Sequence, residues 1–221
     1  IQTKSSIDAK TIKVLNPKEV VFEGGRELEL DAVSEVPRYY VCNAYGVCGI
    51  YSAPGTAVKE AYDTSGIVTN DRGVTVWLKG NRVSRNQIMA IKEESVTEQK
   101  NSLAVCLDNI LRHAGITRNT EYDLAQGKTA TTILSENMTG VQVLDLSGCT
   151  LDAVLYYVNQ DIPVLAILED GEAVLVTGFN EFNVVIMEPA TGKLYKKGMN
   201  DATAWFAENG NHFITYMRTE N

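Results

Sequence analysis

The stretch from residue 151 to residue 195 decides the fold class of this chain. It reads LDAVLYYVNQDIPVLAILEDGEAVLVTGFN over 151–180 and NVVIMEPATGKLY over 183–195. The first residues repeat apolar side chains at intervals of three and four, which predicts a helix. The apolar runs that follow are short and are separated by turns containing Gly, Asp or Asn, which predicts three strands. A helix followed by consecutive strands is typical of an α+β domain.

A central amphipathic helix is predicted upstream, in the run SLAVCLDNILRHAG over 102–115. Gly115 is suited to end it, and we expect Ser102 to cap its start by accepting a bond from the amide of residue 104 or 105. Its apolar face repeats at helical spacing: Leu103, Cys106, Leu107, Ile110 and Leu111. Further helices are expected at 122–126, after Thr150 and at 201–206, and further strands at 164–167, 173–177, 184–187 and 212–216.

The first 95 residues have a different pattern and are predicted to form a small β-rich α+β module. Short apolar runs alternate there with Asn-Pro, Gly-Gly and Asn-Asp-Arg-Gly turns, which favours strands joined by tight turns. A polar stretch over 92–101 separates this module from a second domain over 96–221. The expected strands are 14–15, 19–22, 27–30, 39–42, 47–51, 66–68, 74–78 and 88–91, with one helix over 54–62.

Residues 96–216 resemble the C39-like, bacteriocin-processing branch of the papain-like cysteine peptidases. In that family the motif G-H-A-V-V-V-x-G-Y holds the catalytic His, and V-x-D-P-x-x-G holds the acid that orients it. The corresponding segments here, GEAVLVTGF and VIMEPATG, have Glu172 and Glu188 at those two places. The nucleophile opens the central helix, and alignment from Gly115 gives its place to Ser102. The resemblance implies a papain-like fold with a helical half and an antiparallel sheet half.

The oxyanion-hole residue of the family also differs. Its Gln lies about six residues before the nucleophile, where this chain has Val96, and Gln99 would need a shifted loop to serve instead. All four catalytic places thus hold altered residues, which implies a pseudopeptidase rather than an active enzyme. The sequence alone leaves open whether Ser102 is natural or replaces a Cys.

Thiol peptidases need an imidazole next to the nucleophile, because the thiolate–imidazolium pair both attacks the substrate and protonates the leaving amine. His113 is expected near the far end of the central helix and His212 at the start of a late strand, so neither suits this role. Three interpretations of Ser102 and the two acids remain open. They serve only local structure, they line a groove that binds a peptide or protein, or Ser102 is a nucleophile with a carboxylate base, as in serine-carboxyl peptidases. Cys106 is expected in the core, and its use as a nucleophile is a further rival.

The remaining features limit the class of protein. A net charge of −8 and a pI near 4.9 argue against a nucleic-acid partner, and no apolar run is long enough to span a membrane. Two His and no C-x-x-C motif argue against a metal site, and no cofactor is expected. Cys42 and Cys48 flank a predicted hairpin tip and either form a disulfide or remain thiols. We expect a bacterial protein of the cell envelope or the exterior that binds a peptide or protein partner. A purely structural module is the remaining alternative.

Overall fold

The computed structural model describes residues 12–16, 19–22, 26–29, 36–80, 85, 91 and 101–219, with side chains described from residue 36 onward. The chain divides into two compact units, Ile1–Pro37 and Arg38–Asn221. This division differs from the boundary near residue 95 that the sequence suggested, because residues 39–78 belong to the second unit.

The first unit contains one antiparallel sheet of three strands in the order β1-β2-β3. The strands are β1 (Ile12–Asn16), β2 (Glu19–Phe22) and β3 (Arg26–Glu29). All three overlap the expected strands of this region.

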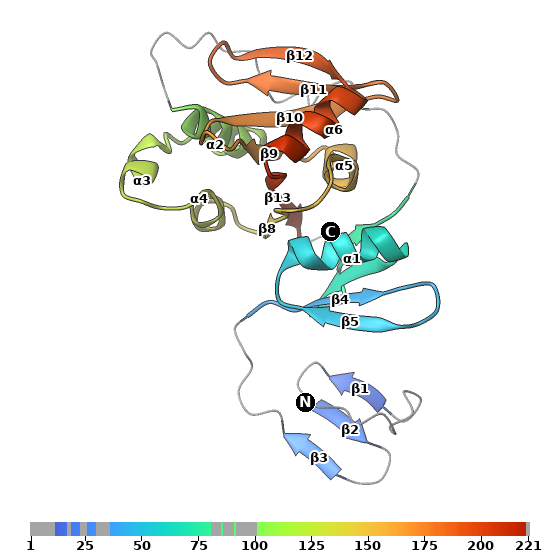
Figure 1. Ribbon diagram of the computed structural model, residues 1–221. Helices are drawn as coiled ribbons and strands as arrows, with labels where there is room; N and C mark the ends of the chain where they lie inside the picture. Colours follow the sequence, from blue (N-terminus) through green and yellow to red (C-terminus); the bar gives the residue numbers. More distant parts are fainter. Residues whose placement is uncertain are drawn as a thin grey trace. The chain divides into compact units, whose positions relative to one another are not determined.

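The second unit begins with a four-stranded antiparallel sheet in the order β5-β4-β6-β7. One helix, α1 (Pro54–Thr64), packs on one face of this sheet (Figure 1). Pro54 suits the first turn of this helix, where a missing backbone N–H leaves no bond unmade. The strands are β4 (Tyr39–Cys42), β5 (Cys48–Tyr51), β6 (Ile67–Asn70) and β7 (Thr75–Leu78).

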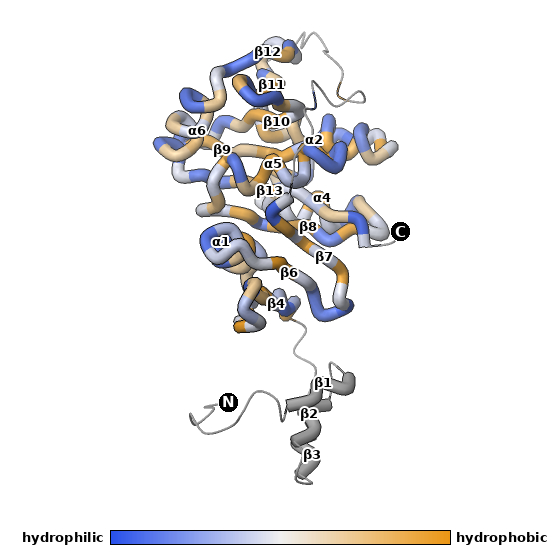
Figure 2. The backbone as a smooth tube through the Cα atoms, turned by 90° about the vertical axis from the view of Figure 1, so that its right-hand side faces the viewer, coloured by the Kyte–Doolittle hydropathy of each residue, from blue (hydrophilic) through white to orange (hydrophobic). Residues whose placement is uncertain are grey.

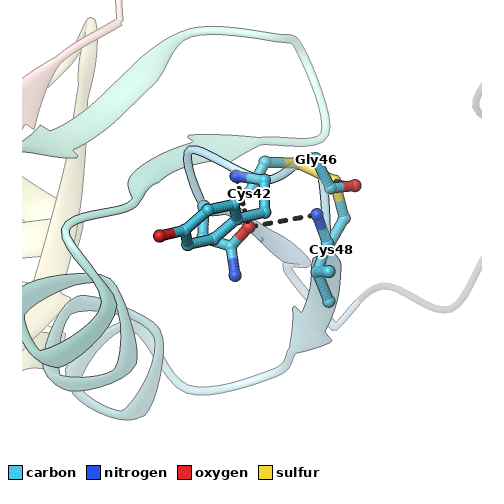
Figure 3. Close-up of a disulfide and its surroundings, with 6 residues drawn as sticks. Cys42, Gly46 and Cys48 are labelled. Carbon is cyan, nitrogen blue, oxygen red and sulfur yellow. Dashed lines mark hydrogen bonds between the residues drawn. A yellow bond between two sulfur atoms is a disulfide. The ribbon is translucent and has the colours of Figure 1, made fainter.

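A disulfide joins Cys42 and Cys48 across the tip of the β4–β5 hairpin (Figure 3). The two cysteines are register partners in the antiparallel pair. Gly46 adopts a φ of +76° within this tip, a conformation that favours glycine. Its N–H donates to the Asn43 carbonyl oxygen at 3.0 Å and closes the turn.

The rest of the second unit is built on a six-stranded antiparallel sheet in the order β12-β11-β10-β9-β13-β8. Every residue of β10 is buried, and both α2 and α5 pack against this strand, so helices cover both faces at the centre of the sheet. Hydrophobic residues concentrate on β9, β10 and α5 (Figure 2). The strands are β8 (Val141–Asp145), β9 (Val164–Ile167), β10 (Ala173–Phe179), β11 (Asn183–Glu188), β12 (Lys193–Gly198) and β13 (His212–Arg218).

Five helices accompany this sheet, and several begin where the sequence predicts. Thr150 caps α5, because its side chain accepts a bond from the Ala153 N–H at 3.3 Å. Gly115 follows the end of α2 with a φ of +84°, as expected for a helix-terminating glycine. The helices are α2 (Ser102–His113), α3 (Glu121–Ala125), α4 (Ala130–Asn137), α5 (Leu151–Asn159) and α6 (Met199–Glu208).

Three elements were not predicted: α4, β8 and β12. β8 and β12 are the two edge strands of the large sheet, so one side of each lacks a neighbouring strand. β12 reads KLYKKG and carries three lysines, which are typical of an exposed edge and weaken the apolar signal of a strand. Helix α4 is short, and three of its residues are buried. The strand expected at 88–91 lies almost wholly outside the described residues.

Buried hydrogen bonds tie the four-stranded sheet to the large sheet and its helices. The Trp77 indole N–H donates to the Ala153 carbonyl oxygen at 3.0 Å, and the Tyr157 hydroxyl donates to the Val76 carbonyl oxygen at 3.1 Å. Both aromatic side chains are almost completely buried. These contacts connect β7 with α5 and explain why residues 39–78 and the C-terminal part form one compact unit.

Helix α1 approaches the loop after β8 so closely that its second residue has to be glycine. A Cβ on Gly55 would lie 2.9 Å from the Ser147 carbonyl oxygen and 3.2 Å from that of Asp145. We therefore expect Gly55→Ala to lower the free energy of unfolding by about 1–3 kcal/mol, although alanine is the better helix former. Urea unfolding measures this, with Thr56→Ala at the exposed neighbouring position as the control. A neutral or stabilising Gly55→Ala would contradict the close packing of α1.

Candidate functional site

The first turn of α2 carries the place that the resemblance assigns to a nucleophile. Asn101 caps this helix, since its side-chain oxygen accepts bonds from the N–H groups of Leu103 at 2.9 Å and Ala104 at 3.3 Å. The prediction that Ser102 provides the cap is therefore wrong. Ser102 is the first helical residue and lies one position too late to act as the cap. Asn is among the best capping residues, so the sequence contained the correct signal one position earlier.

The hydroxyl of Ser102 makes a long-range contact. Its Oγ accepts a hydrogen bond from the backbone N–H of Ala173 at 3.0 Å, across 71 positions of sequence. Ala173 opens β10 and directly follows Glu172. The fold thus brings together the places that the alignment gives to the nucleophile and to the base, which hold a hydroxyl and a carboxylate.

The two acids lie at neighbouring strand ends of the large sheet. Glu172 is exposed at the turn before β10, and its N–H donates to the Asp170 side chain at 3.0 Å. Glu188 is the exposed last residue of β11, and its carboxylate accepts a bond from the Thr191 hydroxyl at 2.9 Å. Leu175 of β10 pairs with Met187 of β11 in antiparallel register. The next step of this register brings Glu188 opposite Val174, which lies two positions after Glu172.

Both imidazoles have other surroundings. His113 is the last residue of α2, and its Nε2 is 2.6 Å from the Asp161 carbonyl oxygen. His212 is exposed at the start of β13, where it pairs with Ile167 of β9. Within the described part of the chain, neither imidazole hydrogen-bonds to Ser102 or to a free thiol. The oxyanion candidate Gln99 lies outside the described residues.

The two free cysteines are buried. Cys106 lies on the inner face of α2, as predicted for a core residue, and burial, together with the charge of Glu172, raises the pKa of its thiol. Cys149 donates a hydrogen bond to the Gly55 carbonyl oxygen at 3.3 Å. Burial raises the pKa of Cys149 to about 12. Both groups are therefore thiols at neutral pH, and the thiolate is the form that attacks a carbonyl.

No group of three or more His, Cys, Asp or Glu side chains among the described residues is arranged to hold a metal ion. No described helix combines the length and the apolar character needed to cross a bilayer.

The comparison with solved structures supports the fold class. A crystal structure described as a "putative C39-like peptidase" from Bacillus anthracis superposes with a TM-score of 0.50. The match covers 62% of this chain and all of that one, at 12% sequence identity. The protein is thus an α+β protein with a C39-like peptidase fold. At this identity the likeness concerns the fold alone and does not bear on the catalytic residues.

Comparisons at the level of sequence place the chain in no family. No family model matches it, and no curated protein matches it. The assignment of the fold therefore rests on the three-dimensional likeness. The assignment of altered catalytic positions rests on the residues of this chain.

Proposed function

We propose that the protein is a non-enzymatic, papain-like member of the C39-like fold that holds a peptide or protein segment at the former catalytic groove. The hydrogen bond between the Ser102 hydroxyl and the Ala173 N–H carries this proposal. It supports the alignment of Ser102 with the nucleophile and of Glu172 with the catalytic His.

The chemistry at these places favours binding over cleavage. A serine hydroxyl needs a strong neighbouring base, and an imidazole supplies one in most hydrolases with a serine or cysteine nucleophile. The described imidazole of His113 is instead bonded at the opposite end of α2. The buried thiols of Cys106 and Cys149 cannot replace the nucleophile, because burial keeps them protonated.

The charge of the groove indicates the kind of segment it holds. Glu172, in the turn before β10, and Glu188, at the end of the adjacent strand β11, are exposed carboxylates, and the whole chain has a net charge of −8. Carboxylates at the rim of an interface favour partners of opposite charge and speed their association. We therefore propose that the groove selects segments with Lys or Arg side chains. We also propose a bacterial envelope or extracellular location, because disulfides such as Cys42–Cys48 persist in oxidising compartments.

A binding experiment with a charge-reversed variant tests the proposal. Glu172→Lys is expected to weaken the capture of basic peptides by about tenfold or more, because it replaces attraction by repulsion at the groove. The melting temperature should hardly change, since the side chain is exposed. Glu181→Lys is the matched control, because Glu181 is also an exposed acid, on the β10–β11 turn at the other end of β10.

Two outcomes would overturn the proposal. One is equal binding by the two variants and the parent protein. The other is hydrolysis of a mixed peptide library at acidic or neutral pH that Ser102→Ala abolishes, which would establish the serine-carboxyl alternative.

A further inference from the structure

A pocket lies at the C-terminal end of α2, at the end of the helix opposite Ser102. Its volume is about 470 Å³, within the range that small-molecule sites occupy. Its walls come from the end of α2, the connection between α4 and β8, and β13. Ile116, Met138 and Val141 contribute apolar surface, and His113, Tyr216 and Arg218 contribute polar groups.

The register of β13 brings two of these polar side chains to the same face of the sheet. Tyr216 pairs with Val143, and Arg218 pairs with Val141. Residues two apart on a strand share a face, so Tyr216 and Arg218 both lie on the side of the sheet that faces this pocket. The bond from the Thr219 N–H to the Gly140 carbonyl oxygen, at 2.9 Å, closes the strand pair beside them.

Three buried side-chain polar atoms lack a hydrogen-bond partner among the described residues, and two of them belong to side chains of this pocket. These two are the hydroxyl of Tyr216, whose side chain is 1% exposed, and Nδ1 of His113. His113 Nε2 faces the Asp161 carbonyl oxygen at 2.6 Å, and a carbonyl oxygen only accepts, so Nε2 carries the proton. In the tautomer protonated at Nε2, Nδ1 is an acceptor that needs a donor. Buried polar groups in native proteins are nearly always hydrogen-bonded.

Charges of opposite sign lie on two sides of the pocket. Arg218 is exposed and has no ion pair within the described part of the chain. The end of α2 beside His113 carries the partial negative charge of a helix C-terminus, which favours cations. The Asp161 carboxylate, paired with Arg85 at 3.1 Å, lies close enough to Tyr216 to influence it. Burial raises the pKa of Tyr216, and the charge of Arg218 opposes this rise.

We propose that this pocket binds a small free α-amino acid. The carboxylate pairs with the Arg218 guanidinium, and the ammonium group donates to His113 Nδ1 at the negative end of α2. The Tyr216 hydroxyl donates to the carboxylate, and the apolar wall accepts a small side chain. This arrangement gives a partner to the two unpartnered atoms of the pocket and matches the sign of charge on both sides. The site is independent of the groove at Ser102.

Nuclear magnetic resonance titration of the full chain tests the proposal. L-alanine, L-lactate and propionate, each at millimolar concentrations, differ only in the group on the α-carbon. L-alanine is expected to bind about tenfold or more tightly than propionate, which has no donor for Nδ1, with L-lactate in between. The long-range ¹⁵N spectrum of the His113 ring should show Nδ1 becoming a hydrogen-bond acceptor when L-alanine or L-lactate is added, and not when propionate is added.

Variants locate the site and separate it from the proposed groove. Arg218→Gln should weaken L-alanine binding by about tenfold, because the carboxylate loses its charged partner. Arg72→Gln, an exposed arginine on the β6–β7 turn, should leave binding unchanged. Glu172→Lys should also leave L-alanine binding unchanged, so the two proposals can fail separately.

The pocket proposal is overturned by equal affinities for L-alanine and propionate, by the absence of saturable shifts at His113, or by L-alanine binding to Arg218→Gln as tightly as to the parent protein. The absence of saturable shifts at His113 is the result expected if a water molecule, and not an amino acid, is the partner of His113 Nδ1 and of the Tyr216 hydroxyl.

Discussion

Replacing Trp77 with alanine is expected to lower the free energy of unfolding of the Arg38–Asn221 unit by about 3–5 kcal/mol, the usual cost of removing a large buried aromatic side chain. Trp77 is 1% exposed and packs against Tyr62 and Tyr156 with ring-centroid distances of 6.1 and 6.2 Å. The variant also leaves the Ala153 carbonyl oxygen without the indole donor. Urea unfolding followed by circular dichroism measures the change.

Trp205→Ala is the matched control. Trp205 is only partly buried on α6, with the Lys197 ammonium 5.0 Å from its ring, so its loss should cost about 1–2 kcal/mol. Equal losses for the two variants would contradict the role of Trp77 in joining the four-stranded sheet to α5. Two separate unfolding transitions within the Arg38–Asn221 unit would favour the boundary at residue 95 as a true folding boundary.

The two free thiols are expected to be nearly inert in the native protein. Burial raises the pKa of Cys149 from 9.0 to about 12, so its thiolate fraction at pH 8 falls by about three orders of magnitude. Cys106 is completely buried and should react at least as slowly. Alkylation by iodoacetamide, followed by intact mass, should label both residues rapidly in guanidinium and only very slowly in the folded state.

Reduction of the Cys42–Cys48 disulfide provides an internal control, because it should add two labels in the folded protein at the exposed hairpin tip. Rapid stoichiometric labelling of native Cys106 by a peptidyl electrophile would instead support an active thiol enzyme.

The raised pKa of Cys149 also predicts a pH dependence of the free energy of unfolding. The folded pKa exceeds the unfolded value, so the stabilising contribution of the buried thiol is complete below about pH 9 and is lost as pH rises towards 12.

The elements that the sequence predicted best are those whose apolar spacing and terminating residues can be recognised within a few consecutive residues. Helix α2 has apolar residues at helical spacing and a terminating Gly115, and β10 is an apolar run between two turns. The edge strands β8 and β12 were missed, because an edge strand is half exposed and its sequence lacks a continuous apolar run. Capping of α2 was assigned one residue late, since Asn101 and Ser102 are both good capping residues and only the backbone shows which one precedes the helix.

The sites depend more strongly on distant contacts. The alignment paired Ser102 with Glu172 by analogy, whereas the bond to Ala173 brings these places together in space. Nothing in the sequence linked His113 with Tyr216, which lies more than a hundred residues later, because the two residues line one pocket only when β13 pairs with β8 beside the end of α2.

The order of residues by itself determined the described helices other than α4, the central strands, the absence of an imidazole at position 172, and the acidic character of the chain. These are local properties, set by side-chain period, turn chemistry and the identity of single residues. The tertiary structure decided which elements share a compact unit, which thiols are protonated by burial, and which polar atoms at the end of α2 lack partners. Such properties depend on desolvation and on contacts between residues far apart in the chain, and no local pattern encodes them.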